Sequence, residues 1–281
     1  RLVGSEMCIR DSGMGVEGAG IATVIAQVAS SLLCLIYIKR KIPLLQLRKK
    51  DFVFDKKEIR THLNISLPMA FQASIIAIGA IILQSALNSL GTDVVAAQAA
   101  AGRIDQFATQ PMMSFGITMA TFTAQNYGAK EYGRILKGVK QCLLMSGGFS
   151  IIAGAVVIIF GHSFVHLFVD ASETRVFELA QIYFNINGSL YWILAILFIL
   201  RYTLQGLGQS KIPTIAGIME LIMRSFAAIF LTALWGYPGA AAASPLAWIG
   251  SVAVLLYSYF KAIKKLRKLD EQQQLERTLE A

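Results

Sequence analysis

Residues 142–160 read CLLMSGGFSIIAGAVVIIF and contain no charged side chain. A run of about 18 or more uncharged, mostly apolar residues is long enough to cross a bilayer as an α-helix. Lys137 and Lys140 precede the run, whereas the next lysine or arginine after it is Arg175. The stretch therefore predicts a membrane-spanning helix whose basic end faces the cytoplasm.

The composition agrees with a membrane protein rather than a soluble one. Hydrophobic residues make up 55% of the 281-residue chain and charged residues only 15%, compared with about a quarter in an ordinary soluble domain. The net charge of +9 does not indicate nucleic-acid binding, because the basic residues gather at the ends of apolar runs. We therefore expect an integral membrane protein whose main partner is the lipid bilayer, with no nucleic acid.

Seven apolar segments can be distinguished, and together they predict an all-α membrane protein. They are residues 16–38, 66–90, 94–124, 142–160, 176–200, 212–235 and 246–260. The connecting segments follow the positive-inside rule. Of the 26 lysines and arginines, 21 fall on one side, including Arg201 and Lys211 in the loop after the fifth segment, and Arg175 alone falls on the other. We predict a multi-pass protein of the plasma membrane with a cytoplasmic C-terminus.

The first and last segments resemble each other, which predicts an internal repeat. Residues 18–23 (GAGIAT) align with residues 239–244 (GAAAAS) at an offset of 221 residues. Secondary transporters are often built from such repeats, with the transport path at their interface. A repeat of this length would hold six spans. We therefore expect a complete protein of twelve spans, of which roughly the first five are missing from this chain.

This interpretation divides the chain into five segments. They are residues 1–12 (RLVGSEMCIRDS), which resemble a translated sequencing adapter; 13–38, the last helix of an N-terminal lobe; 39–65, a basic cytoplasmic linker; 66–260, a C-terminal lobe of six transmembrane helices; and 261–281, a cytoplasmic tail. Within the linker, residues 52–63 form either an interfacial helix, in which Ile59 and Leu63 are four apart among basic residues, or a solvated connection.

Five short stretches stand at the ends of the predicted spans. They are residues 15–23 (GVEGAGIAT), 67–68 (LP), 123–129 (TAQNYGA), 167–170 (LFVD) and 204–213 (LQGLGQSKIP). In this order, and at these places in the topology, the stretches resemble the C-terminal half of the MATE (multidrug and toxin extrusion) family of transporters. The resemblance covers nearly the whole chain after its first twelve residues.

The resemblance implies a fold and a function. The chain would be half of a twelve-helix, secondary active antiporter that exports organic, often cationic, drugs or metabolites in exchange for H⁺ or Na⁺ by alternating access. It would need no cofactor, and its N-terminal lobe would belong to the same polypeptide. Sodium-coupled members carry carboxylates in the seventh and tenth spans, at positions near Ile76 and Leu194, and neither segment of this chain contains an acid. The choice between H⁺ and Na⁺ therefore stays open.

Four ionisable residues lie inside predicted spans, where their cost in hydrocarbon indicates function by default. Arg103 and Asp105 fall near mid-membrane, and they point in different directions because they are two apart on a helix. Asp105 is the candidate coupling group. Glu220 and Arg224 are four apart and can form an ion pair along one helix face, which would serve structure as readily as transport.

Uncharged polar and soft apolar residues are further candidates for a substrate cavity. They are Gln72, Gln84, Asn88, Met112, Met113, Phe115, Asn185, Asn187 and Tyr191. The amides and the tyrosine can hydrogen-bond a polar substrate or tie helices together. The methionines and the phenylalanine, next to a kink expected at Pro111, suit either a promiscuous apolar pocket or ordinary packing.

Other functional classes agree less well with the sequence. A lipid or polysaccharide flippase of the same superfamily would need several cationic residues in its cavity, and only Arg103 and Arg224 are available. An intramembrane enzyme would need catalytic groups clustered at membrane depth, whereas His62, His162 and His166 all lie outside the spans. There is no GxxxxGK[ST] loop to hold ATP. We expect neither enzymatic activity nor a metal site.

Overall fold

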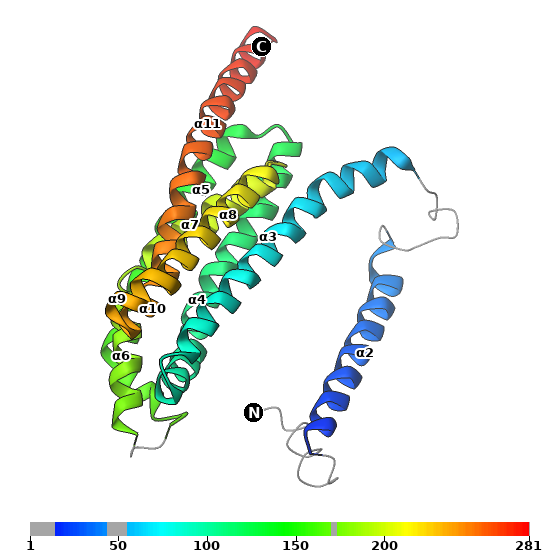
Figure 1. The fold of residues 1–281 in the computed structure, drawn as a ribbon. Helices are drawn as coiled ribbons and strands as arrows, with labels where there is room; N and C mark the ends of the chain where they lie inside the picture. The colour runs from blue at the N-terminus through cyan, green and yellow to red at the C-terminus, as the bar shows by residue number, and fades with distance from the viewer. Residues whose placement is uncertain (1–14, 44–54, 170–172, 281) are drawn as a thin grey trace. The chain divides into compact units, whose positions relative to one another are not determined.

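The structure, a computed structural model, describes residues 15–43, 55–169 and 173–280. These residues form helices joined by short turns, with no β-strand among them, which confirms the predicted all-α class (Figure 1). The chain divides into two compact units, Arg1–Ile59 and Arg60–Ala281. Residues 1–12, the segment that resembles a sequencing adapter, lie outside the described residues.

The first unit contains one long helix, α2 (Gly15–Lys41), which agrees with the first predicted span. Its last turn carries three basic residues, Lys39, Arg40 and Lys41. Positive side chains at this end complement the helix dipole and are typical of a membrane boundary. From Gly20 onward, α2 is long and apolar enough to cross a membrane.

Two long helices follow, α3 (Lys56–Asn88) and α4 (Thr92–Gly128), joined by a tight turn. Gly91 occupies the turn with φ of 108°, a conformation that a residue with a side chain rarely adopts. α3 begins ahead of the span predicted from residue 66. Residues 56–65 of the predicted linker are therefore helical and continue directly into the span. With 33 residues, α3 is about 50 Å long and exceeds a hydrocarbon core of about 30 Å.

The next three helices differ from the prediction at one point. α5 (Tyr132–Val165) contains the fourth predicted span and extends beyond it. The fifth predicted span is a broken pair, because α6 (Thr174–Gly188) and α7 (Tyr191–Gly206) meet at a bend of 50°. At this bend the backbones pack closely, and a Cβ on Gly154 would collide with the Gly188 carbonyl oxygen. The single continuous helix expected for this span is therefore corrected to two.

The sixth predicted span is continuous but irregular. α8 (Lys211–Phe226) passes into a π-helical turn, η3 (Ala227–Leu231), and then into α9 (Thr232–Trp235). The Thr232 hydroxyl donates a hydrogen bond of 3.2 Å to the carbonyl of Ala227. Isolated π-turns are rare and mark local departures from regular helix packing. The three elements together are long and apolar enough to form one span.

The last span continues well beyond the membrane-spanning length. Gly236, with φ of 63°, leads into the short α10 (Tyr237–Ala241) and the long α11 (Ala243–Glu280). α11 continues through the predicted cytoplasmic tail, which is therefore helical as far as it is described (Figure 1). Leu266 on this extension packs with Ile135 of α5 in a small apolar cluster.

Within the described ranges, five helices are long and apolar enough to cross a membrane, or six if the bent α6–α7 pair forms one span. α4 corresponds to the third of the seven predicted spans, but it is not among these helices although it has 37 residues. It contains Arg103, Asp105 and several amide side chains, which make it less apolar than its neighbours. Polar groups are thus concentrated on α4.

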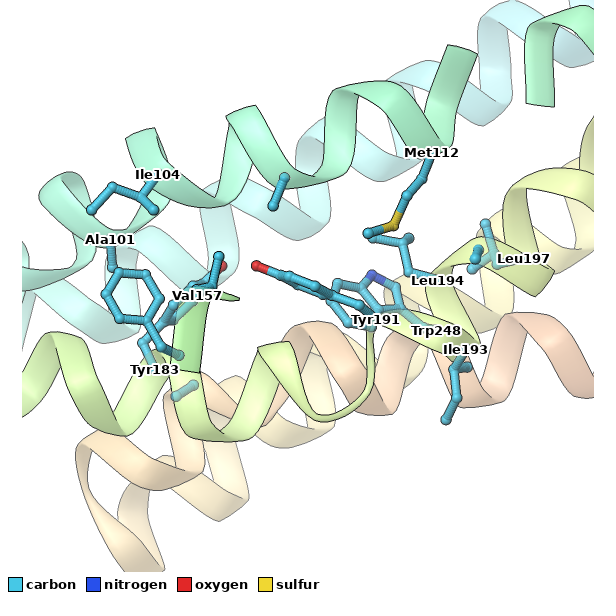
Figure 2. Packing of buried hydrophobic residues seen from close by; sticks show 14 of the residues in the cluster. Ala101, Ile104, Met112, Val157, Tyr183, Tyr191, Ile193, Leu194, Leu197 and Trp248 are labelled. Carbon is cyan, nitrogen blue, oxygen red and sulfur yellow. The ribbon is translucent and has the colours of Figure 1, made fainter. Parts of the chain in front are cut away.

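The second unit has an apolar core built largely from α4, α6, α7 and α11. Tyr191 and Met112 are among its largest fully buried side chains. Figure 2 shows Met112 of α4 reaching toward Leu194 of α7, with Tyr191 and Trp248 packed close by. Side-chain packing of this kind, together with interhelical hydrogen bonds, holds helices together in a bilayer. The core therefore fixes the relative positions of α4 and α7.

Candidate functional site

Asp105 and Tyr191 connect α4 and α7 inside the second unit. The Tyr191 hydroxyl donates a hydrogen bond of 2.6 Å to Asp105 Oδ1. Tyr191 is fully buried, and its ring lies next to that of Trp248, with centroids 6.3 Å apart (Figure 2). This packing holds the hydroxyl in place. The two residues were separate candidates in the sequence, and the fold brings them together.

Two more tyrosines extend this polar group. Tyr183 of α6 lies near the Asp105 carboxyl group, and the Tyr237 hydroxyl donates to Gln98 Oε1 at 3.1 Å. No lysine or arginine in the described part of the chain forms an ion pair with Asp105. The side chains named around the carboxyl group therefore carry uncharged hydroxyls.

An open cavity of about 740 Å³ lies along α4. Its lining residues are Gln106, Phe107, Gln110, Pro111, Ser114, Phe115 and Thr118. The Ser114 and Thr118 hydroxyls donate to carbonyls of their own helix one turn earlier, whereas Phe107 is 79% exposed. This face of α4 therefore offers amide groups and aromatic rings to a ligand. Its first lining residue, Gln106, directly follows Asp105 in the chain.

The other residues predicted on α4 have different surroundings. Arg103 is exposed. Met112 is fully buried in the core and Met113 is partly buried, and neither lines the α4 cavity. Of the three candidates around the proline, only Phe115 contributes to the cavity.

The amides predicted on α3 form hydrogen bonds within the protein. Gln72 is buried and accepts a hydrogen bond of 3.4 Å from Gln205 of α7. Gln84 and Asn88 are exposed, and Gln84 Nε2 donates to Asn88 Oδ1 at 2.9 Å. Gln72 thus ties α3 to α7, whereas the other two residues stabilise one turn of α3.

The two asparagines predicted on α6 differ in burial. Asn187 is fully buried, and its Nδ2 donates to the carbonyls of Tyr183 and Ala241 at 3.2 and 3.1 Å. It therefore links the end of α6 to α10. Asn185 is exposed and accepts a hydrogen bond of 2.9 Å from Gln181.

Asn185 lines a second cavity of about 540 Å³ together with His162, His166 and Phe177. The two imidazole rings are 5.0 Å apart and stack on the ring of Phe177 at 4.9 and 4.2 Å. The part of the chain that the structure describes contains no group of three or more His, Cys, Asp or Glu residues placed to hold a metal ion.

A buried ion-pair network joins α7, α8 and α11. Glu220 accepts hydrogen bonds from Arg201 at 2.7 Å and from Arg224 at 3.1 Å, and Arg201 also donates to Ser251 at 3.1 Å. The predicted pair of Glu220 and Arg224 is thus confirmed as an i,i+4 ion pair. All three charged side chains are at most about a tenth exposed.

Arg201 corrects the sequence-based topology. It was assigned to a cytoplasmic loop because the apolar run ends just before it, but it lies inside α7 and is 7% exposed. The helix continues to Gly206, which brings the guanidinium group to Glu220. The available signal in the sequence was Gly206, because a helix that ends at this glycine includes Arg201.

A bundle of long apolar helices that holds ionisable side chains between them is typical of a multi-pass membrane transport protein. The MatE family model matches residues 68–230, more than half of the chain, and the chain belongs to this family. The resemblance to MATE transporters drawn from the sequence is therefore confirmed.

Similar proteins are known in sequence and in structure. The chain is 24% identical over 273 residues to the "Probable multidrug resistance protein YoeA" of Bacillus subtilis (strain 168), covering 91% of this chain and 56% of that protein. It is 22% identical over 226 residues to the "Multidrug export protein MepA" of Staphylococcus aureus (strain NCTC 8325 / PS 47), covering 80% of this chain and 49% of that protein. The chain thus spans about half the length of the curated relatives it matches.

The solved structures support the fold. A crystal structure of a MATE protein in complex with MaL6 superposes with a TM-score of 0.86 at 19% identity, covering 95% of this chain and 60% of that one. A MATE family transporter in an outward-facing conformation gives a TM-score of 0.82 at 17% identity, again over 95% and 60%. At these identities the likeness concerns the fold alone.

Proposed function

We propose that this chain is the C-terminal lobe of a secondary active antiporter that exports organic, often cationic, compounds in exchange for H⁺ or Na⁺. The observation that carries the proposal is the hydrogen bond of 2.6 Å between Tyr191 and Asp105 of α4, the helix that also lines the open cavity. The names of the relatives, a multidrug resistance protein and a multidrug export protein, support an efflux role.

Asp105 is the proposed coupling group. Charge in a low-dielectric interior is costly unless it is compensated, and the hydroxyl groups near this carboxyl group belong to uncharged tyrosines. A proton or a sodium ion that binds the carboxylate would neutralise this charge. Because Asp105 and Tyr191 stand on different helices, a change in their hydrogen bond would alter how α4 packs against α7.

The α4 cavity is the proposed place of substrate contact. Its volume of about 740 Å³ lies in the range of roughly 300–1,000 Å³ that is usual for small-molecule sites. The faces of Phe107 and Phe115 can attract an organic cation, and Gln106 and Gln110 can accept hydrogen bonds. No cofactor is required for this binding.

A second lobe would complete the transport path. The chain covers 49–60% of the matched relatives and structures, and related transporters place their substrate sites between two repeats. We place the open face of α4 toward an N-terminal lobe of the same polypeptide, with the lobes rocking by alternating access. The C-terminus would then be cytoplasmic.

The test begins with recovery of the upstream gene sequence and expression of the complete transporter. Ethidium efflux from cells would be compared between the wild type, Asp105→Asn and the control Asp93→Asn, whose side chain is 51% exposed and pairs with Arg175. We expect efflux to fall at least about tenfold in Asp105→Asn only, which corresponds to about 1.4 kcal/mol in the transport barrier. Efflux with and without sodium at constant pH would distinguish the two coupling ions.

Two other outcomes would overturn parts of the proposal. Unchanged efflux in Asp105→Asn would move the coupling group elsewhere in the protein. If the intact transporter exported no organic cation, a flippase would become the better explanation. The structure offers a flippase little support, because Arg224 is buried and paired with Glu220 and is not free to bind a phosphate group.

A further inference from the structure

A groove at the basic end of the second unit has no role in the proposed transport cycle. It has a volume of about 610 Å³ and lies between residues 63–68 of α3 and the turn that joins α7 to α8. Leu63 and Asn64 line one side, and Gly208 and Lys211 line the other. The groove is separate from the α4 cavity, with which it shares no lining residue.

The two walls of the groove are fixed to each other. The Ser210 hydroxyl donates a hydrogen bond of 3.2 Å to the Asn64 carbonyl, and the Thr214 hydroxyl donates one of 2.9 Å to the Pro68 carbonyl. Gly208 forms the turn with φ of 75°, which favours glycine. The groove is therefore a built feature of the fold rather than a gap between mobile segments.

The groove combines apolar and positive groups. Leu63 and Leu67 line it and are each 54% exposed. Lys211 is an exposed lining residue. Arg60, also exposed, stands one turn before Asn64 and so lies on the same face of α3. None of the lining residues is acidic, so the groove suits a ligand with an anionic head and an apolar tail.

The position of the groove selects the source of such a ligand. Lys211 directly precedes the apolar run of α8, and Arg60 precedes that of α3, so both stand at a membrane boundary. This is the side that the distribution of basic residues assigns to the cytoplasm, where anionic lipids are enriched. We propose that the groove binds one anionic phospholipid, with its phosphate near Arg60 and Lys211 and an acyl chain along Leu63 and Leu67.

Lipid retention by the purified complete chain tests this proposal. The detergent-solubilised protein would be titrated with phosphatidylglycerol and, separately, with phosphatidylcholine of the same acyl chains, and bound lipid would be counted by native mass spectrometry. We expect roughly tenfold tighter binding of the first phosphatidylglycerol molecule, since each basic residue near a membrane surface contributes a several-fold preference for anionic lipid. The double variant Arg60→Gln/Lys211→Gln should lose this preference.

A matched control distinguishes a specific lipid site from general attraction of anionic lipid to a positively charged surface. Lys264→Gln/Arg267→Gln removes the same two charges from exposed positions on α11 and should keep the preference. Equal losses in both double variants, or no preference in the wild type, would overturn the proposal. Displacement of the lipid by millimolar inorganic phosphate would also overturn the proposal, because the groove would then be a site for a free anion rather than for a lipid.

A second variant tests the apolar wall. Leu67→Glu places a negative charge on an exposed lining position and should abolish preferential binding while the helical circular dichroism and its melting temperature stay unchanged. Retained binding by a folded Leu67→Glu protein would contradict the proposed path of the acyl chain. Because the readout is lipid binding, its outcome is independent of whether the transporter exports organic cations.

Discussion

Glu220 is the carboxylate that compensates two buried arginines. It lies 2.7 Å from Arg201 and 3.1 Å from Arg224, and the Nε atoms of both arginines have no hydrogen-bond partner among the described residues. Removing this carboxylate would leave two positive charges without a counter-charge in the protein interior. A buried charge that loses its partner is far more costly than a surface pair that is broken.

Glu220→Gln is therefore expected to destabilise the protein by about 3–5 kcal/mol. The measurement is the temperature at which half of the protein in detergent is no longer monodisperse. The control is Asp93→Asn, which breaks an exposed pair of 3.6 Å with Arg175 and should cost at most about 1 kcal/mol. Similar midpoints for the two variants would show that the network contributes little to stability.

Tyr191→Phe removes the hydroxyl that donates to Asp105 and leaves the buried ring in place. We expect a loss of about 1.5–3 kcal/mol in stability, as for a hydrogen bond to a charged group, together with reduced ethidium efflux by the complete transporter. Tyr257→Phe, at a residue that is 77% exposed, is the control.

If Tyr191 acts only through Asp105, Tyr191→Phe should have no additional effect on efflux in an Asp105→Asn background, because residues in one network are not additive. Additive losses of efflux would mean that the two residues act separately.

Individual residues could be predicted from the sequence only where their partners are close in the chain. The pair of Glu220 and Arg224 follows from their spacing of four on one helix. Arg201 joins them from another helix, and Tyr183 reaches Asp105 from α6. Such partners depend on how the helices pack, and a tyrosine in an apolar run carries no local signal that its hydroxyl has a buried acceptor.

Helical elements were more predictable than their irregularities. Apolar run length correctly located α2, α3 and α5 as long helices, because a span in lipid must satisfy its backbone hydrogen bonds internally. The break between α6 and α7 was not predicted, although Gly188 and Ser189 stand at it and such residues favour a turn. At the break Gly188 packs closely against Gly154 of α5, and these two residues are far apart in sequence.

The close contact at this break gives a prediction for α5. Gly154→Ala would place a Cβ against the Gly188 carbonyl oxygen, and we expect it to destabilise the protein by about 1–3 kcal/mol through overpacking. Gly148→Ala is a matched control on the same helix, because a Cβ there has no neighbour within 4 Å. That substitution should be neutral or stabilise the helix by about 0.5–1 kcal/mol. Equal effects in thermal denaturation would contradict the role of this contact.

The topology of the whole molecule rests on whether α4 crosses the membrane. With 37 residues α4 is long enough, but its composition is too polar to qualify, in contrast to α3 and α5 on either side of it. A carboxylate and several amides lower its apolar character, but they can be accommodated where they face protein or a water-filled cavity. If α4 spans, the turn before it and the turn after it must lie on opposite sides of the membrane.

Single cysteines placed in a variant without Cys8, Cys34 and Cys142 can test this topology. Ser89 and Ser163 are exposed and lie at the end predicted to face outward, whereas Ala129 and Lys264 are exposed at the basic end. A membrane-impermeant maleimide added to intact spheroplasts should label cysteine at the first two positions. It should label the other two only after permeabilisation, because their positive surroundings retain that end in the cytoplasm.

The pattern of labelling distinguishes two failures of the prediction. Reversed labelling at all four positions would invert the orientation and place the lipid-binding groove on the outer side. Labelling of Ser89→Cys and Ala129→Cys from the same side would mean that α4 does not span. Asp105 and its hydrogen bond to Tyr191 would then lie in a re-entrant segment. The α4 cavity would open to one side of the membrane only, which is incompatible with alternating access through this face.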